Sequence, residues 1–480
     1  MTRQPNILFI MPDQLRADFV GLYGADFVRT PHIDSLGAYG DTFDNAVSPF
    51  PICVPCRAAL LTGRNAIETG VLDNTKWLRP ERTAIGTRNW TTLLGEAGYH
   101  TAAIGKMHFT PWDADEGFAE RRISDDKRHI AIEDDYFDYL AAHGRRKTHG
   151  RELAGYDETK GAVLAAHPAE HLQDRWVANE TIAFLDRQSP GRPFAAFIGF
   201  PSPHCPYDPT PEALAAVDAA RIPPPIPPTA DSDGLRAEMI ASYLKPWADV
   251  DYTDLDADQI RAIRHHYVAL IEMLDGEIGR VLDALRSGPF ARDTVVIFCS
   301  DHGDYVGDYR LMGKTFFHEP SSRVPLVVAD WRKPAAPRRI AAPVALPDIY
   351  ATLLELAGIA SPYRESAYRS LFAAPDPARM VFGLAPNGLM ARSETFKLCR
   401  YTGLPAQAFD LARDPAEQHN VFADPACREV VDAHDRFLTD TLMGSLMRAH
   451  ADKSVLPAQN ADPAAFHARG WRWPAAGAEG

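Results

Sequence analysis

The 480-residue sequence predicts an α/β fold with a largely parallel sheet, on three observations. Helix-like segments alternate with short β-rich runs, which is typical of this fold class. Apolar residues make up 46% and charged residues 24%, as in soluble globular enzymes and unlike membrane proteins. The length is sufficient for two or three domains with well-filled cores.

Four apolar runs predict strands of the central sheet, and polar side chains follow each of them. The runs are NILFIM, HTAAIG, FAAFIGF and TVVIFCS, and the side chains that follow are Asp13 and Gln14, Lys106 and His108, His204, and Asp301 and His302. Open α/β sheets bind ligands outside the carboxyl ends of their strands, so we expect these ends to converge on one crevice. Solvated loops also follow strands, but four ends that carry only Asp, Gln, Lys and His indicate a site.

Apolar periodicity predicts helices over 91–99 (TTLLGEAGY) and over 262–288, where a glycine closes the run. The proline cluster at 221–234 predicts an extended surface loop. A proline- and alanine-rich stretch near 367–380 has the composition of a linker.

These boundaries predict three parts of the chain. They are a catalytic α/β domain over 1–370, a small C-terminal α+β domain over 380–450 with a helix near 428–446, and a tail over 451–480. The tail carries Trp471 and Trp473.

Charge and cysteine usage narrow the class of protein. The net charge of −14 argues against general nucleic-acid binding, which relies on basic surface. The longest apolar runs have strand length, so we expect no membrane span. The N-terminal MTRQPNILFIM lacks the long apolar region and cleavage site of a secretory signal, and the six cysteines fit free thiols in a reducing compartment. We therefore expect a cytoplasmic protein.

The segment PFPICVPCRAALLTGR, residues 49–64, places Cys53 just ahead of the N-terminus of a predicted helix. Pro55 suits the first helical turn, and Gly63 can end the helix. Free N–H groups and the helix dipole at this position favour an anion and lower a thiol pKa. The setting suits a nucleophile near a sulfate or phosphate group, with Arg57 one turn away to hold its oxygens.

Cys53 and Cys56 also form a C-x-x-C pair, which is typical of redox motifs and of zinc sites. A thioredoxin-like βαβ unit does not surround the pair, and zinc needs four ligands where the pair supplies two. A non-catalytic thiol redox or zinc protein remains an alternative, which zinc release on thiol alkylation would support.

CVPCRAALLTGR resembles the sulfatase signature, Cys-x-Pro-x-Arg followed by Leu-Thr-Gly. NILFIMPDQLRAD, GKMH, PSPHCPY, FCSDHGDYVGD, GKTFFHEPSSRVPL and FDLARDPAEQHN are similar to further family segments and stand in the family's order along most of the chain. VLDNT, GKMH and SDHGD look most like the choline-sulfatase branch, with the phosphonate monoester hydrolases as a neighbouring group. The resemblance implies the alkaline-phosphatase-like fold, with a large mixed, mostly parallel sheet flanked by helices, and hydrolysis of sulfuric esters.

The resemblance also implies the cofactors. In that family a maturation enzyme oxidises the signature cysteine to formylglycine (3-oxoalanine), so a formylglycine-generating enzyme is an expected partner. The residues implied as ligands of one divalent metal are Asp13, Gln14, Cys53 after conversion, Asp301 and His302. The family favours calcium, but many members have an acidic residue at the Gln14 place and Asn at the His302 place. The imidazole leaves manganese or magnesium as alternatives.

In the implied reaction, one hydroxyl of the formylglycine hydrate attacks sulfur and releases the alcohol. The second hydroxyl, deprotonated, collapses to the aldehyde and expels sulfate. Arg57, Lys106 and Lys314 would neutralise the equatorial oxygens. His204 is the candidate that protonates the leaving oxygen and His108 the candidate that accepts the hydrate's proton, and an exchange of these two roles stays open.

Asn74, in VLDNT, is a candidate donor to the substrate oxygens. The expected substrate is a small sulfate ester, with choline sulfate as a hypothesis from the branch resemblance. A phosphonate monoester or phosphodiester hydrolase with the same site is the alternative. Lys106 with His108 favours the sulfatase, because the phosphonate hydrolases carry Tyr and Thr there. A homo-oligomer is expected, in which Trp471 and Trp473 could reach a neighbouring subunit and contribute to an aromatic cage for a quaternary ammonium.

Overall fold

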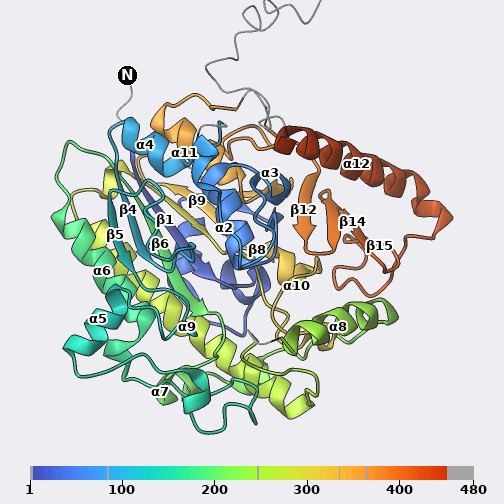
Figure 1. Ribbon diagram of the computed structural model, residues 1–480, viewed down its shortest axis with the longest axis horizontal. Helices are drawn as coiled ribbons and strands as arrows, with labels where there is room; N and C mark the ends of the chain where they lie inside the picture. The colour runs from blue at the N-terminus through green and yellow to red at the C-terminus, as the bar shows by residue number, and fades with distance from the viewer. Residues whose placement is uncertain (1–3, 84–85, 246–247, 334–335, 364–365, 451–480) are drawn as a thin grey trace, which may run out of the picture.

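An eight-stranded sheet forms the centre of the molecule (Figure 1). The computed structural model describes residues 4–83, 86–245, 248–333, 336–363 and 366–450. In spatial order the strands are β10 (Arg338–Ile340), β2 (Gly40–Phe43), β9 (Leu326–Asp330), β7 (Thr294–Cys299), β1 (Asn6–Asp13), β6 (Phe194–Pro203), β4 (His100–Gly105) and β5 (Glu120–Ile123). The strands from β7 to β5 pair in parallel, and β9 is antiparallel to both of its neighbours. The prediction of a mixed, mostly parallel sheet is confirmed.

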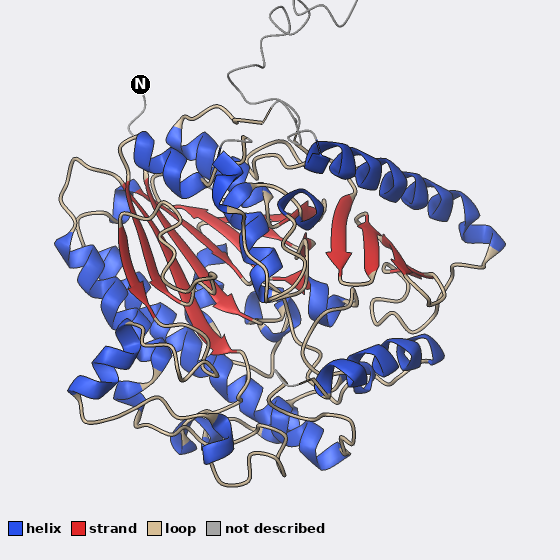
Figure 2. Ribbon diagram, in the orientation of Figure 1, coloured by secondary structure: helices blue, strands red, loops and turns tan. Residues whose placement is uncertain are grey.

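Helices cover both faces of this sheet (Figure 2). Successive side chains of β1 explain the two layers, because Leu8 and Ile10 enter one core cluster while Ile7, Phe9 and Met11 enter the other. The first face is covered by α1 (Pro31–Gly37), α6 (Gln173–Arg187) and α9 (Ala257–Ser287), and the second by α2 (Cys53–Thr62), α4 (Trp90–Glu96) and α11 (Asp348–Ala357).

The shorter elements lie around these layers. The helices of the part before residue 380 also include α3 (Ala66–Thr69), α5 (Asp135–Ala142), α7 (Pro211–Ala215), α8 (Ala230–Tyr243) and α10 (Glu319–Ser322). A three-stranded sheet has the order β11 (Val344–Ala345), β3 (Ala46–Val47) and β8 (Arg323–Val324).

Both helices predicted from periodicity are present, as α4 and α9, but the predicted loop at 221–234 is wrong over its last residues. Helix α8 begins at Ala230 because Thr229 and Ser232 form a capping box. The Thr229 hydroxyl accepts the Ser232 N–H at 3.1 Å, and the Ser232 hydroxyl accepts the Thr229 N–H at 2.8 Å.

The C-terminal part of the described chain is a four-stranded antiparallel sheet under one helix. Its strands are β12 (Val381–Ala385), β13 (Gly388–Arg392), β14 (Phe396–Tyr401) and β15 (Gln407–Asp410), and the helix is α12 (Arg428–His450). This arrangement confirms the small α+β unit. The domain boundaries stay a prediction, and Trp471 and Trp473 lie outside the described residues.

Among the described residues, each helix is too short or too polar to serve as a membrane span.

The carboxyl ends of β7, β1, β6 and β4 lie side by side, since these four parallel strands are neighbours. Two glycines allow a close approach of β4 and β6 at this edge. Gly105 has φ +88°, and a Cβ there would lie 2.1 Å from the Gly199 carbonyl oxygen. A Cβ on Gly199 would lie 2.0 Å from the Lys106 carbonyl oxygen. The predicted convergence of the strand ends is therefore confirmed.

Candidate active site

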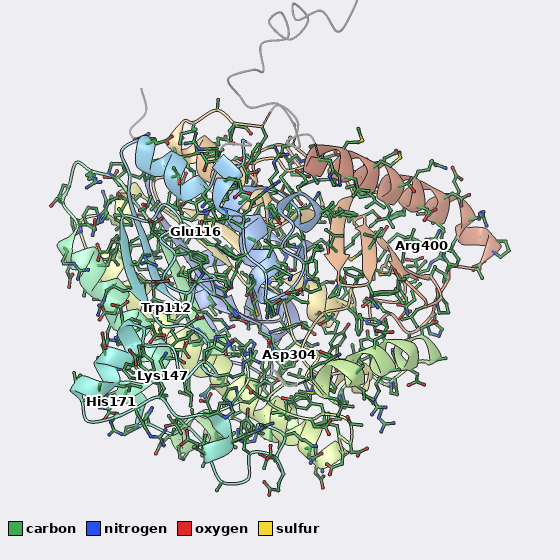
Figure 3. All side chains as sticks on the ribbon, viewed as in Figure 1. Trp112, Glu116, Lys147, His171, Asp304 and Arg400 are labelled. Atoms are coloured by element: carbon green, nitrogen blue, oxygen red, sulfur yellow. The ribbon has the colours of Figure 1, made fainter. Side chains whose placement is uncertain are left out.

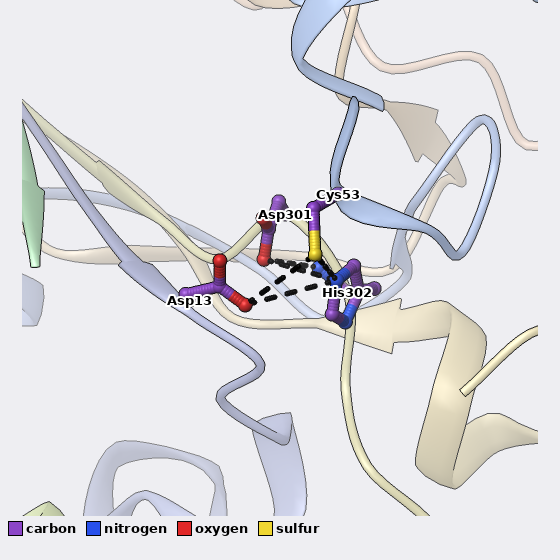
Figure 4. Close-up of side chains that lie close together, drawn as sticks. All are labelled: Asp13, Cys53, Asp301 and His302. Atoms are coloured by element: carbon purple, nitrogen blue, oxygen red, sulfur yellow. Dashed lines mark hydrogen bonds and ion pairs between the residues drawn. The ribbon is translucent and has the colours of Figure 1, made fainter. Parts of the chain in front are cut away.

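Asp13, Cys53, Asp301 and His302 meet at this edge of the sheet (Figure 4). One ligand atom of each lies within 4.8 Å of the others, and all four residues have 0% exposure. The Cys53 Sγ lies 3.2 Å from His302 Nε2 and 3.9 Å from Asp13 Oδ1. Two carboxylates, one imidazole and the side chain at position 53 are a donor set that fits a divalent cation.

Helix α2 presents Cys53 to this cluster. Cys53 is the first residue of the helix, whereas the sequence predicts a helix that begins just after it. Gly63 follows the end of the helix in the left-handed conformation, as predicted. The Asn74 side-chain oxygen accepts the Val54 N–H at 3.1 Å and so satisfies a free donor of the first turn. Asn74 therefore helps to hold the helix N-terminus, and its contact with substrate stays a prediction.

The two cysteines of α2 have opposite electrostatic environments. Burial and Asp13 both act to raise the pKa of the Cys53 thiol, but Lys314 and His302 outweigh them and lower it. Burial and Asp301 raise the pKa of Cys56 well above its usual value, and its thiol donates to the Asp301 carbonyl oxygen at 3.1 Å. Both thiols are free. The environment singles out Cys53, which argues against an equivalent C-x-x-C pair.

Arg57 contacts two members of the cluster, and its guanidinium is fully buried. Its Nε donates to Asp301 at 3.1 Å, its Nη2 to Asp13 at 3.2 Å, and its Nη1 to the Lys106 carbonyl oxygen at 2.7 Å. These contacts hold the two carboxylates in place. Arg57 therefore orients the carboxylates, and its contact with the substrate oxygens stays a prediction.

Lys106 bridges two carboxylates from the end of β4. Its Nζ lies 2.8 Å from Asp13 and 2.6 Å from Asp126, and the lysine has 0% exposure. Burial acts to lower its pKa, but Asp126 and Asp13 raise it, so Lys106 remains charged. Arg128 holds Asp126 from the other side through two hydrogen bonds of 2.8 and 3.0 Å.

Lys314 connects several predicted residues. Its Nζ lies 2.5 Å from Gln14 Oε1, 2.8 Å from His204 Nε2 and 3.3 Å from Cys53 Sγ. The Gln14 amide donates to Asp304 through its other end. Gln14 therefore borders the four-residue cluster, and its role as a metal ligand stays a prediction.

The two predicted catalytic histidines are both buried and neutral at neutral pH. Burial and Lys314 lower the pKa of His204 well below its usual value, and burial and Lys106 do the same for His108. His204 Nδ1 lies 2.7 Å from the Cys205 carbonyl oxygen, which can only accept, so Nδ1 carries the hydrogen and Nε2 accepts from Lys314. Among the described residues, His108 forms no hydrogen bond with Cys53, and its Nδ1 is buried without a partner.

Sequence reasoning missed two carboxylates that organise this site. Asp304, labelled near the middle of the molecule in Figure 3, accepts the Tyr207 hydroxyl at 2.6 Å and the Gly313 N–H at 2.9 Å, and so fixes the segment that leads into Lys314. Asp304 lies in the SDHGD segment, so the motif carried a signal for it. Asp126 follows the edge strand β5, which is too short and polar to be recognised as a strand by apolar patterning.

Known proteins with similar sequences include sulfatases. The family model named Sulfatase matches residues 5–359. The chain is 28% identical to an arylsulfatase of Clostridium perfringens over 475 residues, which cover 92% of this chain and 95% of the relative. It is 30% identical to a choline-sulfatase of Rhizobium meliloti over 448 residues, which cover 88% of this chain and 83% of the relative.

The solved structure of a phosphonate monoester hydrolase of Agrobacterium radiobacter superposes with a TM-score of 0.77 at 24% identity, covering 92% of this chain and 96% of that one. This likeness establishes the same alkaline-phosphatase-like fold.

Proposed function

The chain belongs to the sulfatase family and hydrolyses sulfuric esters, and on that premise we propose that Cys53, converted to formylglycine, is the nucleophile for a small sulfate ester. The observation that carries the proposal is the place of Cys53. Its Sγ lies at the helix N-terminus, 3.3 Å from Lys314 Nζ and next to His302 and Asp13. Cationic and N–H groups at that point stabilise negative charge on a sulfate group.

The proposed metal ligands are Asp13, Asp301, His302 and the converted side chain at position 53, with Gln14 at the border. When bound, the divalent cation would act as a Lewis acid on the ester oxygens. Calcium is the ion we propose, with manganese or magnesium as alternatives, because one ligand is an imidazole. Arg57 forms ion pairs with both carboxylates and so limits their movement.

Formylglycine would supply a geminal diol, whose two hydroxyls serve attack on sulfur and expulsion of sulfate. We assign the leaving-oxygen proton to the His204–Lys314 pair. Lys314 holds this proton at rest, because Nε2 of the neutral His204 accepts a hydrogen bond from Lys314 Nζ. His108 is neutral and its Nδ1 is free to accept, which suits the base that deprotonates the second hydroxyl.

The proposal is tested first by mass spectrometry. The chain co-expressed with a formylglycine-generating enzyme is digested with trypsin, and the mass of the peptide from Thr30 to Arg57 is measured. An aldehyde at Cys53 is expected. A free thiol or a Cys53–Cys56 disulfide, with a control sulfatase converted in the same cells, would contradict the proposal.

Activity tests the same residues independently. Cys53→Ala and Asp301→Ala should retain the circular dichroism spectrum of the wild type and lose aryl-sulfate hydrolysis. Undiminished hydrolysis by either folded variant would overturn the proposed mechanism.

A phosphonate monoester or phosphodiester hydrolase is the second candidate, and the fold likeness to the Agrobacterium enzyme supports it. Matched aryl sulfate and aryl phosphonate esters distinguish the two. We expect the larger kcat/KM for the sulfate, because Lys106 and His108 occupy the positions that resemble the sulfatases. A larger kcat/KM for the phosphonate would make the phosphonate hydrolase the favoured candidate.

Choline sulfate is the specific substrate we propose to try first, because the Rhizobium meliloti relative is a choline-sulfatase. We also propose a homo-oligomer and a cytoplasmic location. The location rests on cysteine usage, since all six thiols are free. Fractionation of the native cells and light scattering of the purified chain test these two proposals.

A further inference from the structure

A second group of metal-binding side chains lies beside the active site. It consists of His108, Asp125 and His129, and one donor atom from each lies within 4.8 Å of the other two. We propose that these residues form a separate site for a zinc-type transition-metal ion, and that its occupation inhibits the enzyme by engaging His108. The binding part is independent of the proposed function, whereas the inhibition rests on the role proposed there for His108.

The topology explains why these residues meet. His108 follows β4, and Asp125 and His129 follow β5, its parallel neighbour. The carboxyl ends of adjacent parallel strands lie at one edge, so both loops start from the same place. The His129 N–H donates to the Asp126 carbonyl oxygen at 2.9 Å, and this turn brings the second imidazole back toward the first. The two rings lie 5.5 Å apart between centroids.

Each imidazole of the group has a ring nitrogen that lacks a hydrogen-bond partner among the described residues. Within the described part of the chain, the Nδ1 atoms of both His108 and His129 are buried without a hydrogen bond. His108 is only 6% exposed and has φ +58°, a conformation that costs energy for a residue other than glycine. An unsatisfied buried nitrogen also costs free energy, which a bound ion would recover.

The carboxylate of the group is also available. Asp125 accepts the Asp126 N–H at 2.7 Å, and no lysine or arginine of the described residues forms an ion pair with it. The neighbouring Asp126, in contrast, is paired with both Lys106 and Arg128. Asp125 is therefore the carboxylate at this edge whose charge a cation would neutralise.

The donor set selects the class of ion. Two imidazoles with one carboxylate suit zinc and its neighbours, whereas calcium prefers oxygen ligands alone. Zinc binds these atoms at about 2.0–2.2 Å, so binding fixes the ligand positions closely and any adjustment has to come from a side chain that can move. His129 supplies this movement, because it is the most exposed of the three and lies in a loop.

Zinc binding is tested on the full chain by equilibrium dialysis against zinc(II), in a Cys53→Ala, His302→Ala background that takes the thiol and imidazole donors out of the competing four-residue cluster. This background should retain one zinc ion per chain. Addition of His129→Ala should abolish it, while His143→Ala, at an exposed histidine outside the group, should not. Asp125→Asn is the second variant, and it should weaken binding by about tenfold or more. Equal zinc uptake with and without His129 and Asp125 would overturn the site.

Activity tests the inhibitory part. In the presence of saturating calcium, zinc should inhibit ester hydrolysis by the wild type, and His129→Ala should raise the half-inhibitory zinc concentration about tenfold with its activity without zinc unchanged. If zinc binds through His129 and hydrolysis continues, the inhibitory role is wrong and the site remains. If the chain hydrolyses no ester at all, the dialysis result still decides the site, so the two failures are distinguishable.

Discussion

At the scale of single residues, one hydrogen bond joins His204 and Lys314. The Nε2–Nζ distance of 2.8 Å and the hydrogen on His204 Nδ1 place the shared proton on Lys314 in the resting protein. The motif PSPHCPY pointed to His204 from the sequence, but the partner that sets its protonation lies 110 residues away and could not be predicted from local pattern.

The first prediction concerns the leaving group. His204→Ala should lower kcat for an alkyl sulfate by about 10²–10⁴-fold, because an alkoxide leaves poorly without a proton. The loss should be far smaller for nitrophenyl sulfate, whose phenolate leaves unprotonated. Parallel kcat measurements on the two esters check this, and equal losses would remove His204 from proton donation.

His318 gives a pH dependence to stability. Burial and Lys397 lower its pKa to about 3 in the folded protein, compared with about 6.5 in an unfolded chain. Between these values only the unfolded state binds the proton, so stability falls as the pH falls through this window.

The expected loss is on the order of 2 kcal/mol between pH 7.5 and pH 5.0. Urea unfolding at both pH values measures this loss. In His318→Gln the difference in unfolding free energy between the two pH values should be smaller by that amount, whatever the absolute stability of the variant. An identical pH difference in the two proteins would contradict the assignment.

At the scale of elements, the contact of β4 with β6 depends on two residues without side chains. The Lys106 N–H donates to the Gly199 carbonyl oxygen at 2.7 Å, and the Lys106 carbonyl oxygen accepts from Arg57. The sequence predicts both strands, but the contact between their backbones appears only once the two strands are paired.

Gly199→Ala should therefore destabilise the protein by about 1–3 kcal/mol, because its Cβ would meet backbone that cannot rotate away. It should also lower activity by displacing Lys106. Gly276→Ala in α9 is the matched control, since its Cβ meets no atom within 4 Å and alanine favours a helix. Chemical denaturation and kcat of both variants check this, and equal stability of the two would contradict it.

At the scale of the whole molecule, much of the fold and of the four-residue cluster could be predicted. Asp13 ends the apolar strand β1, and Asp301 and His302 come shortly after β7, so the rule for parallel sheets brings them together. The carboxylate-orienting role of Arg57 could not be predicted, since it depends on the depth of α2 beside the sheet. The partner of Lys106 could not be predicted either, because Asp126 follows an edge strand without an apolar pattern.

A buried charge network joins the C-terminal sheet to the catalytic part. Lys397, on β14, has 0% exposure and lies 2.7 Å from Glu319, 2.8 Å from Glu417 and 2.7 Å from the Phe317 carbonyl oxygen. Arg392 pairs with the same Glu319 at 3.0 Å. The network therefore links β13 and β14 to α10.

Lys397→Met should destabilise the protein by about 3–5 kcal/mol, because two buried carboxylates lose their shared cation. Arg400→Met is the control on the same strand, since its pair with Asp435 is solvent-exposed and should contribute less than about 1 kcal/mol. Thermal and urea unfolding of both variants check this, and a Lys397→Met protein as stable as the control would contradict it.

Because the strand ends lie side by side, the reacting group and the organic group of an ester would contact different parts of this chain. Most of the groups that we propose for binding the sulfate lie at strand ends and on the first turns of α2, which packing holds in place. The segments 107–119, 124–134 and 204–229 are longer connections at the same edge, and they are where an organic group would be distinguished. Changes in these connecting segments can therefore alter which ester is accepted without altering the residues at the strand ends. This separation makes the chain a suitable starting point for directed evolution toward other esters.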